Sequence, residues 1–223
     1  MSRSISPRQF HEAEGVEDWR VVADGVCASF RTGSFAAGAR LVAAIGALPG
    51  LDEHPPDVDV RHDGVTVRLV TITQDDFGLT ERDLDLARQV SAMARELGLP
   101  ADPSAVQTVF VTIDALDLPT VMPFWRAVLG YVDRADSPED LIDPRFRGPS
   151  LWFQQLDAPR PQRNRIHFDV AVPHDEAADR IAATLAAGGR LLSDEEAPAF
   201  WVLADAEGNE ACITTWQGRD PVT

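Results

Sequence analysis

An internal repeat in the second half of the chain constrains the fold more than any other feature. Residues 110–114 (FVTID) are strand-like and precede a helical pattern that ends at Leu129-Gly130. Fifty-seven residues further on, residues 167–171 (HFDVA) precede a second helical pattern that ends at Gly188-Gly189. Each unit then continues into further strand-like runs. The spacing predicts two βαβββ units in tandem, whose half-sheets can curve around a shared cup.

A break in the pattern divides the chain into two predicted domains. Residues 98–104 (GLPADPS) contain two prolines, after a strong helical pattern and before a strand-like run. We therefore expect one domain at residues 1–99 and a second at about 105–219. With 223 residues, 44% of them hydrophobic, the chain is long enough for two cores.

The first half alternates between helical and strand-like patterns. Residues 6–9 (SPRQ) have the form of a capping box with proline at the first helical position. Strand pairs flank the Asp-Gly dipeptides at residues 24–25 and 63–64, and apolar spacing predicts helices at residues 34–48 and 80–97. The predicted order is α-β-β-α-β-β-α, an antiparallel sheet with helices on one face. Together with the paired βαβββ domain, this makes the fold class α+β.

Composition excludes several classes of function. All 20 basic residues are arginines, so no lysine is available for Schiff-base chemistry. A net charge of -16 argues against binding to nucleic acid or anionic membranes, because phosphates would repel the chain. No window approaches 18 uninterrupted apolar residues, and the first residues lack the apolar region of a signal peptide. Cys27 and Cys212 do not suggest a disulfide framework, so we expect a cytoplasmic protein without nucleic-acid or membrane partners.

Residues 53–57 (EHPPD) and residues 78–83 (GLTERD) give the clearest chemical signal. Together with Trp19 and residues 65–71, they resemble the active-site signature of the pterin-4a-carbinolamine dehydratases, and the resemblance covers residues 17–97. It implies a lyase that removes water from the 4a-carbinolamine of tetrahydrobiopterin. Such a reaction needs an acid for the departing hydroxyl and a base for the ring N–H proton. An imidazole suits both roles, because its pKa lies near neutral pH.

The resemblance assigns roles residue by residue. His54 matches the first of three motif histidines, the second is replaced by Pro55, and the third falls on Ile72 or Thr73. His62, where an aromatic residue is expected, could substitute for a missing histidine or could simply end a hairpin. The predicted catalytic residues are His54, His62 and, in a supporting role, Asp83, and the predicted substrate contacts are Glu53, Pro56, Asp57 and Thr71.

Three of these residues also have plain structural interpretations. Asp83 lies where a residue would cap the helix that begins after Thr80. His54 could be a turn residue before two prolines, and Asp57 could be solvated.

Three segments of the second domain resemble the glyoxalase/bleomycin-resistance superfamily, also called the vicinal oxygen chelate proteins. They are residues 123–131 (PFWRAVLGY), 164–169 (NRIHFD) and 205–210 (DAEGNE), and the resemblance covers residues 106–217. It implies the paired βαβββ fold. It leaves the function open, because the superfamily includes isomerases, dioxygenases and drug-sequestering proteins.

Metal-dependent members of this superfamily place a ligand on the first and the last strand of each unit. The corresponding positions here are Phe110, Gln154 or Gln155, His167 and Cys212. Phe110 cannot coordinate a metal, and Cys212 stands where glutamate is usual, with Glu210 as a nearby alternative. We therefore expect no metal and no cofactor.

The second domain is rich in tryptophan, and Trp216 is one of four. Some could line an apolar cup that stacks on a flat heterocycle, while others could belong to the core. The predicted ligand contacts in this domain are Trp125, Trp152, Trp201 and His167. His167 could instead be a hydrogen-bonded core residue. Asp114 and Asp169 occupy inner-strand positions and could add polar contacts.

Three functions compete. The first is a bacterial dehydratase-like enzyme fused to a glyoxalase-like domain that binds a small molecule, either a pterin or another flat heterocycle. The alternative is a non-catalytic protein that binds or sequesters a small molecule in the aromatic cup. A metal-dependent lyase or oxygenase in the second domain is a third hypothesis, weakened by its missing ligands. The dehydratase resemblance also implies a homo-oligomer.

Overall fold

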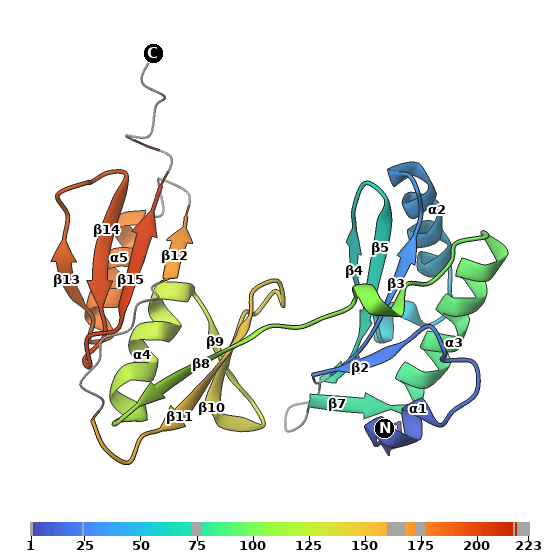
Figure 1. The fold of residues 1–223 in the computed structure, drawn as a ribbon, viewed down its shortest axis with the longest axis horizontal. Helices are drawn as coiled ribbons and strands as arrows, with labels where there is room; N and C mark the ends of the chain where they lie inside the picture. Colours follow the sequence, from blue (N-terminus) through green and yellow to red (C-terminus); the bar gives the residue numbers. More distant parts are fainter. Residues whose placement is uncertain are drawn as a thin grey trace. The chain divides into compact units, whose positions relative to one another are not determined.

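The computed structural model describes residues 2–23, 25–72, 77–159, 168–172, 177–215 and 217. The chain divides into two compact units, residues 1–108 and 109–223, and each has its own hydrophobic core (Figure 1). In the described part of the chain, no helix is both long enough and apolar enough to cross a membrane.

A four-stranded antiparallel sheet in the order β2-β3-β5-β4 forms the centre of the first unit. Its strands are β2 (Arg20–Val22), β3 (Gly25–Arg31), β4 (Asp57–Val60) and β5 (Gly64–Leu69). Alternate residues of β3, such as Val26, Ala28 and Phe30, are buried in the core.

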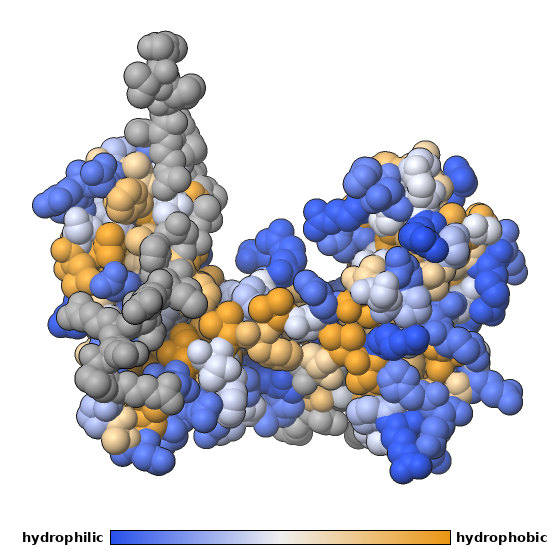
Figure 2. All heavy atoms as spheres, in the orientation of Figure 1, coloured by the Kyte–Doolittle hydropathy of each residue, from blue (hydrophilic) through white to orange (hydrophobic). Residues whose placement is uncertain are grey.

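Two long helices pack on this core. Figure 1 shows α2 (Phe35–Gly46) and α3 (Glu81–Glu96) on one side of the sheet. Leu41 of α2 and Val90 of α3 are fully buried in the same cluster as the strands. Hydrophilic residues dominate the outer surface over α3 (Figure 2). This arrangement confirms the predicted antiparallel sheet with helices on one face.

A second, three-stranded sheet in the first unit, in the order β1-β7-β6, is an addition to the predicted elements. Its strands are β1 (Ser4–Ile5), β6 (Thr71–Ile72) and β7 (Phe77–Thr80). The predicted strand that follows the Asp-Gly dipeptide at residues 63–64 therefore ends early: its pairing with β3 stops at Leu69, and β6 pairs with β7 instead. The pairing of Thr71 with Gly78 brings Thr71 beside the segment that leads into α3.

Short segments complete the first unit at both ends. The helix α1 (Pro7–His11) has the predicted capping box, because the Ser6 hydroxyl accepts from Gln9 N and the Gln9 side chain accepts from Ser6 N. At the other end, the segment before η2 (Pro103–Ala105) extends along β3, with Asp102 N donating to Ser29 O at 2.7 Å. The hydrogen bond between Asp102 and Ser29 explains why the compact unit continues past residue 99.

The second unit consists of two modules with the same element order. The first contains β8 (Phe110–Ala115), α4 (Leu118–Leu129), β9 (Val132–Arg134), β10 (Ser137–Ile142) and β11 (Ser150–Gln155). The second contains β12 (Phe168–Ala171), α5 (Ala177–Ala186), β13 (Arg190–Ser193), β14 (Phe200–Ala204) and β15 (Glu210–Thr214). The sheet orders are β8-β11-β10-β9 and β12-β15-β14-β13, with the first and last strands of each module parallel. The predicted pair of βαβββ units is confirmed.

An aspartate organises the turn before the last strand in both modules. The Asp143 carboxylate accepts from the backbone N–H groups of Arg145, Arg147 and Gly148. The Asp205 carboxylate accepts from those of Glu207 and Asn209, at the first two of the same offsets. Burial works against the charge of Asp143, but the backbone donors outweigh it and hold the pKa of this carboxyl below its usual value.

Trp125 of α4 lies at the centre of the second core. Its side chain is 2% exposed and makes an edge-to-face contact with Phe168 of β12, with ring centroids 5.4 Å apart. Its Nε1–H donates to Asp205 at 3.1 Å. Glu207, from the same turn as Asp205, accepts from the backbone N–H groups of Leu116 and Asp117 just before α4. The two modules are thus joined through polar as well as apolar contacts.

Candidate functional site

The site in the first unit begins with the N-terminus of α3. Thr80 ends β7 and is the N-cap of this helix, and Asp83 is its third residue. The Asp83 side chain is fully buried, and its Oδ2 accepts from Thr80 N at 2.7 Å and from Thr80 Oγ1 at 2.9 Å. A buried carboxylate needs such donors, and the helix N-terminus also favours its negative charge. The predicted capping role of Asp83 is therefore present.

The same carboxylate holds His54. The Oδ1 atom of Asp83 lies 2.8 Å from His54 Nε2, and the hydroxyl of Thr71 donates to Oδ2 at 2.7 Å. His54 follows the short 3-10 helix η1 (Leu51–Glu53), which starts after Gly50 in the left-handed conformation at φ +74°. The His54 side chain is only 14% exposed. Three segments of the chain therefore meet at one buried carboxylate.

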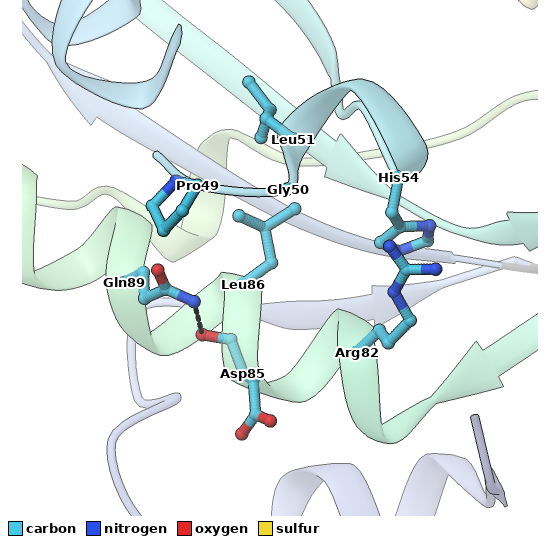
Figure 3. A pocket seen from close by; sticks show the side chains of 8 residues that line it. All are labelled: Pro49, Gly50, Leu51, His54, Arg82, Asp85, Leu86 and Gln89. Atoms are coloured by element: carbon cyan, nitrogen blue, oxygen red, sulfur yellow. Dashed lines mark hydrogen bonds between the residues drawn. The ribbon is translucent and has the colours of Figure 1, made fainter. Parts of the chain in front are cut away.

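His54 opens on a pocket of about 170 Å³. The pocket is lined by Pro49, Gly50, Leu51, His54, Arg82, Asp85, Leu86 and Gln89. Figure 3 shows His54 and Arg82 at one end of it, Pro49 and Gln89 at the other, and Leu86 between them. The four residues from α3 follow a helical spacing that places them on one face. That spacing could have identified them from the sequence, but only His54 of this lining was among the predicted site residues.

The predicted substrate contacts of the first unit are not among the residues that line the pocket. Glu53 is exposed beside the pocket, with its carboxylate 3.6 Å from the Arg82 guanidinium. Pro56 is half-buried, and Asp57 begins β4 and pairs with Arg68 at 3.0 Å. Asp57 and Pro56 do not line the pocket. The Thr71 hydroxyl is engaged with Asp83 and not directed to an open space.

His62 is not brought to this site. It lies in the turn between β4 and β5, where its side chain is 88% exposed and its Nδ1 is 3.3 Å from Asp63. His54 precedes the first residue of β4, whereas His62 follows the last, so the two imidazoles lie at opposite ends of that strand. The hairpin-end interpretation of His62 agrees with this position, and a shared acid–base site with His54 does not.

The positions where the family resemblance predicts further histidines are Pro55 and either Ile72 or Thr73, and none of these residues carries an imidazole. Pro55 is exposed, and Ile72 on β6 is 44% exposed. Thr73 lies outside the described residues. Within the described residues, His54 is therefore the one imidazole at this pocket.

The structure separates the predicted aromatic contacts of the second unit. Trp125 is a core residue and offers almost no surface to a ligand, and Trp201 packs against the same core while remaining partly exposed. Trp152 of β11 is 40% exposed, on the face opposite the buried Leu151 and Phe153. His167, Trp216 and the side chain of Asp169 lie outside the described residues.

Of the positions that would hold a metal in the second unit, His167 lies outside the described residues. Phe110 has no coordinating atom, and the amide of Gln155 donates to Leu116 O at 2.8 Å. Cys212 is buried on β15. Among the residues that the structure describes, no group of three His, Cys, Asp or Glu side chains is arranged to hold an ion.

Comparison with known proteins agrees with the division of the chain into two units. The family model described as pterin 4 alpha carbinolamine dehydratase matches residues 4–93, and that described as glyoxalase-like domain matches residues 110–214. A relative from Aquifex aeolicus is 31% identical over 98 residues, which are 44% of this chain and 97% of that protein. A relative from Nocardia farcinica is 35% identical over 82 residues, or 37% and 84% of the two chains. Both have the name pterin-4-alpha-carbinolamine dehydratase, assigned provisionally.

Among solved structures, a glyoxalase-related enzyme from Fulvimarina pelagi matches with a TM-score of 0.40 and 21% identity. The match covers 49% of this chain and 88% of that one. The sequence matches of the first unit, which span nearly the whole Aquifex relative, establish the relationship. The chain belongs to the pterin-4a-carbinolamine dehydratase family through its first unit, to which a glyoxalase-like domain is fused.

Proposed function

We propose that the first unit dehydrates a 4a-hydroxytetrahydropterin, with His54 as the proton-transfer group. The observation that supports this proposal best is the pair of His54 and the buried Asp83, 2.8 Å apart, at the edge of a pocket. In the reaction, the bond between C4a and the hydroxyl oxygen breaks and the hydroxyl leaves as water after gaining a proton. A ring N–H proton is lost to a base, so the number of protons balances.

An imidazole is suited to both proton transfers. In its neutral form one ring nitrogen accepts while the other donates, and it changes charge near neutral pH. Asp83 orients the ring and stabilises the imidazolium that forms when His54 accepts a proton, as a buried carboxylate does for a catalytic histidine elsewhere. The geometry therefore supports His54 as one oriented acid–base group.

The pocket matches a small, flat and partly polar ligand. Leu51 and Leu86 offer apolar surface, and Arg82 and Gln89 offer hydrogen-bond donors. Its volume of about 170 Å³ lies below the roughly 300–1,000 Å³ of sites for drug-sized ligands, which favours a compact bicyclic ring. We propose the pterin ring as this ligand.

The reduced set of histidines sets the expected rate. General acid–base catalysis typically contributes about 10²- to 10⁴-fold per group. With Pro55, and either Ile72 or Thr73, in place of two imidazoles, we propose that turnover is slow but measurable. Homo-oligomer formation and a cytoplasmic location stay predictions from the family resemblance and the composition.

The experiment that tests this function measures dehydration of 4a-hydroxytetrahydropterin, generated in situ by a coupled hydroxylase. The full chain is compared with His54→Ala and with His62→Ala, a matched control that removes an exposed imidazole from the far end of β4. We expect acceleration by the wild type and by His62→Ala, and none by His54→Ala. A wild-type rate equal to the buffer rate would refute the proposal.

A second candidate, a non-catalytic binding protein, is favoured by Trp152. Its indole is 40% exposed on the open face of the first sheet of the second unit, where a flat heterocycle could stack. The two candidates predict different results for pterin binding and for the dehydration rate. If the wild type binds a pterin but gives no acceleration, and Trp152→Ala abolishes binding while His54→Ala does not, the binding function replaces the enzymatic one.

A further inference from the structure

The Asp83 carboxylate is held by a donor that a helix cap does not require. Capping involves Thr80, which supplies its N–H and its hydroxyl to Oδ2. The additional donor is the hydroxyl of Thr71, 2.7 Å from the same oxygen and located on β6. The two threonine hydroxyls also lie 3.0 Å from each other. Oδ2 is thus surrounded by donors from two separate elements.

This arrangement leaves the other carboxylate oxygen for His54. An ionised carboxylate can only accept hydrogen bonds, so the Nε2 atom 2.8 Å from Oδ1 must bear the proton. In the neutral imidazole, Nδ1 is then the acceptor. No described residue is a hydrogen-bond partner of this Nδ1, and His54 lines the pocket. Nδ1 is therefore the ring nitrogen available to a ligand.

We propose that Thr71 is a positioning residue for His54. Its hydroxyl, together with Thr80, holds Asp83 so that His54 keeps its proton on Nε2 and presents Nδ1 as the nitrogen that exchanges a proton with the substrate. This inference rests on the proposed dehydratase function for the final step, the proton exchange. It also replaces the predicted role of Thr71 as a substrate contact, because the hydroxyl is committed to Asp83.

Removal of the Thr71 hydroxyl should weaken the hydrogen bonding that positions Asp83 without leaving a cavity at residue 71. In Thr71→Val, a methyl group replaces the donor at nearly the same volume, and Thr80 still caps the helix. Thr71→Ser keeps the donor and is the matched control. With one donor fewer at Oδ2, Thr80 alone holds the carboxylate, so the contact between Oδ1 and His54 Nε2 that selects one tautomer is weakened.

The first test needs no activity. Nitrogen-15 NMR of the histidine rings in the full chain, with His54 assigned by comparison with His54→Ala, reports which nitrogen bears the proton. We expect the neutral ring of His54 to be protonated on Nε2 in the wild type and in Thr71→Ser, and to populate both tautomers in Thr71→Val. A wild-type ring protonated on Nδ1, or an unchanged tautomer in Thr71→Val, would overturn the inference.

The second test is kinetic. Loss of one hydrogen bond to a charged group predicts that kcat of Thr71→Val falls about tenfold while KM stays within about twofold, with recovery in Thr71→Ser. A fall confined to KM would identify Thr71 as a substrate contact and overturn the inference. If the wild type itself is inactive, the proposed function fails. The tautomer measured in the wild type and in Thr71→Val still shows whether Thr71 positions His54.

Discussion

Replacing Asp83 by asparagine tests the electrostatic part of this site with the smallest change in shape. The carbonyl oxygen of the new side chain would have to stay at the position of Oδ2, because three donors converge there. Its NH₂ group would then face His54 Nε2 and donate to it. The proton of His54 would move to Nδ1, which is the nitrogen that we expect to accept from the substrate. Asp83→Asn should therefore be folded, less stable and strongly impaired in dehydration.

The loss of stability follows from the buried contacts of Asp83. Hydrogen bonds to charged groups contribute about 1.5–3 kcal/mol each, against about 0.5–1.5 kcal/mol for neutral pairs. A negative charge in the first turn of a helix adds about 0.3–1 kcal/mol. Since the carbonyl retains part of each bond, we expect Asp83→Asn to lower the free energy of unfolding of the first unit by about 2–3 kcal/mol.

The assay must follow the first unit alone, because two units in one chain need not unfold together. Hydrogen exchange measured by mass spectrometry in increasing urea does so through peptides within residues 1–108. Glu81→Gln is the control, since it removes an exposed carboxylate from the same helical turn and should cost less than about 1 kcal/mol. Equal losses for Asp83→Asn and Glu81→Gln would show that the buried charge of Asp83 does not stabilise the first unit.

Three further predictions concern other residues. Trp125→Phe removes the donor to the buried Asp205 and should lower the free energy of unfolding of the second unit by about 1–3 kcal/mol, measured in urea by hydrogen exchange. The pKa of Asp143 is lowered by folding, so its stabilisation is present above the ordinary pKa of about 3.9 and is lost as pH falls through the folded value. Asp143→Ala should thus reduce the urea midpoint of the second unit at pH 6, and by less at pH 3. Pro55→His should raise the dehydration rate, by up to about 10²-fold if a second imidazole reaches the substrate; an unchanged rate would show that this position is not limiting.

Local patterns predicted much of the fold. The repeated strand and helix runs of the second unit are long enough to show their periodicity, and the Thr80–Asp83 spacing identified the helix start. His54 could be predicted as a catalytic residue because its neighbours form a recognisable motif. Each of these signals lies within a short stretch of sequence, where propensity and spacing act directly.

The remaining features depend on tertiary pairing. Thr71 reaches Asp83 because β6 leaves the main sheet and pairs with β7, and two-residue strands leave no periodic signal. The separation of His62 from His54 follows from the length of β4, which puts them at opposite ends of one strand. Trp125 can be buried in the core because Asp205, eighty residues away, accepts from its indole N–H. Composition alone could not distinguish it from the more exposed Trp152.

The central claim is that the imidazole of His54 transfers the protons of dehydration. Chemical rescue tests it most directly: the dehydration rate of His54→Ala is measured with increasing free imidazole, alongside His62→Ala and a protein-free control for catalysis by imidazole in the buffer. If His54 transfers these protons, the rate rises above the protein-free control and saturates in His54→Ala only. A full rate in His54→Ala without imidazole, or no rescue at any concentration, would contradict it.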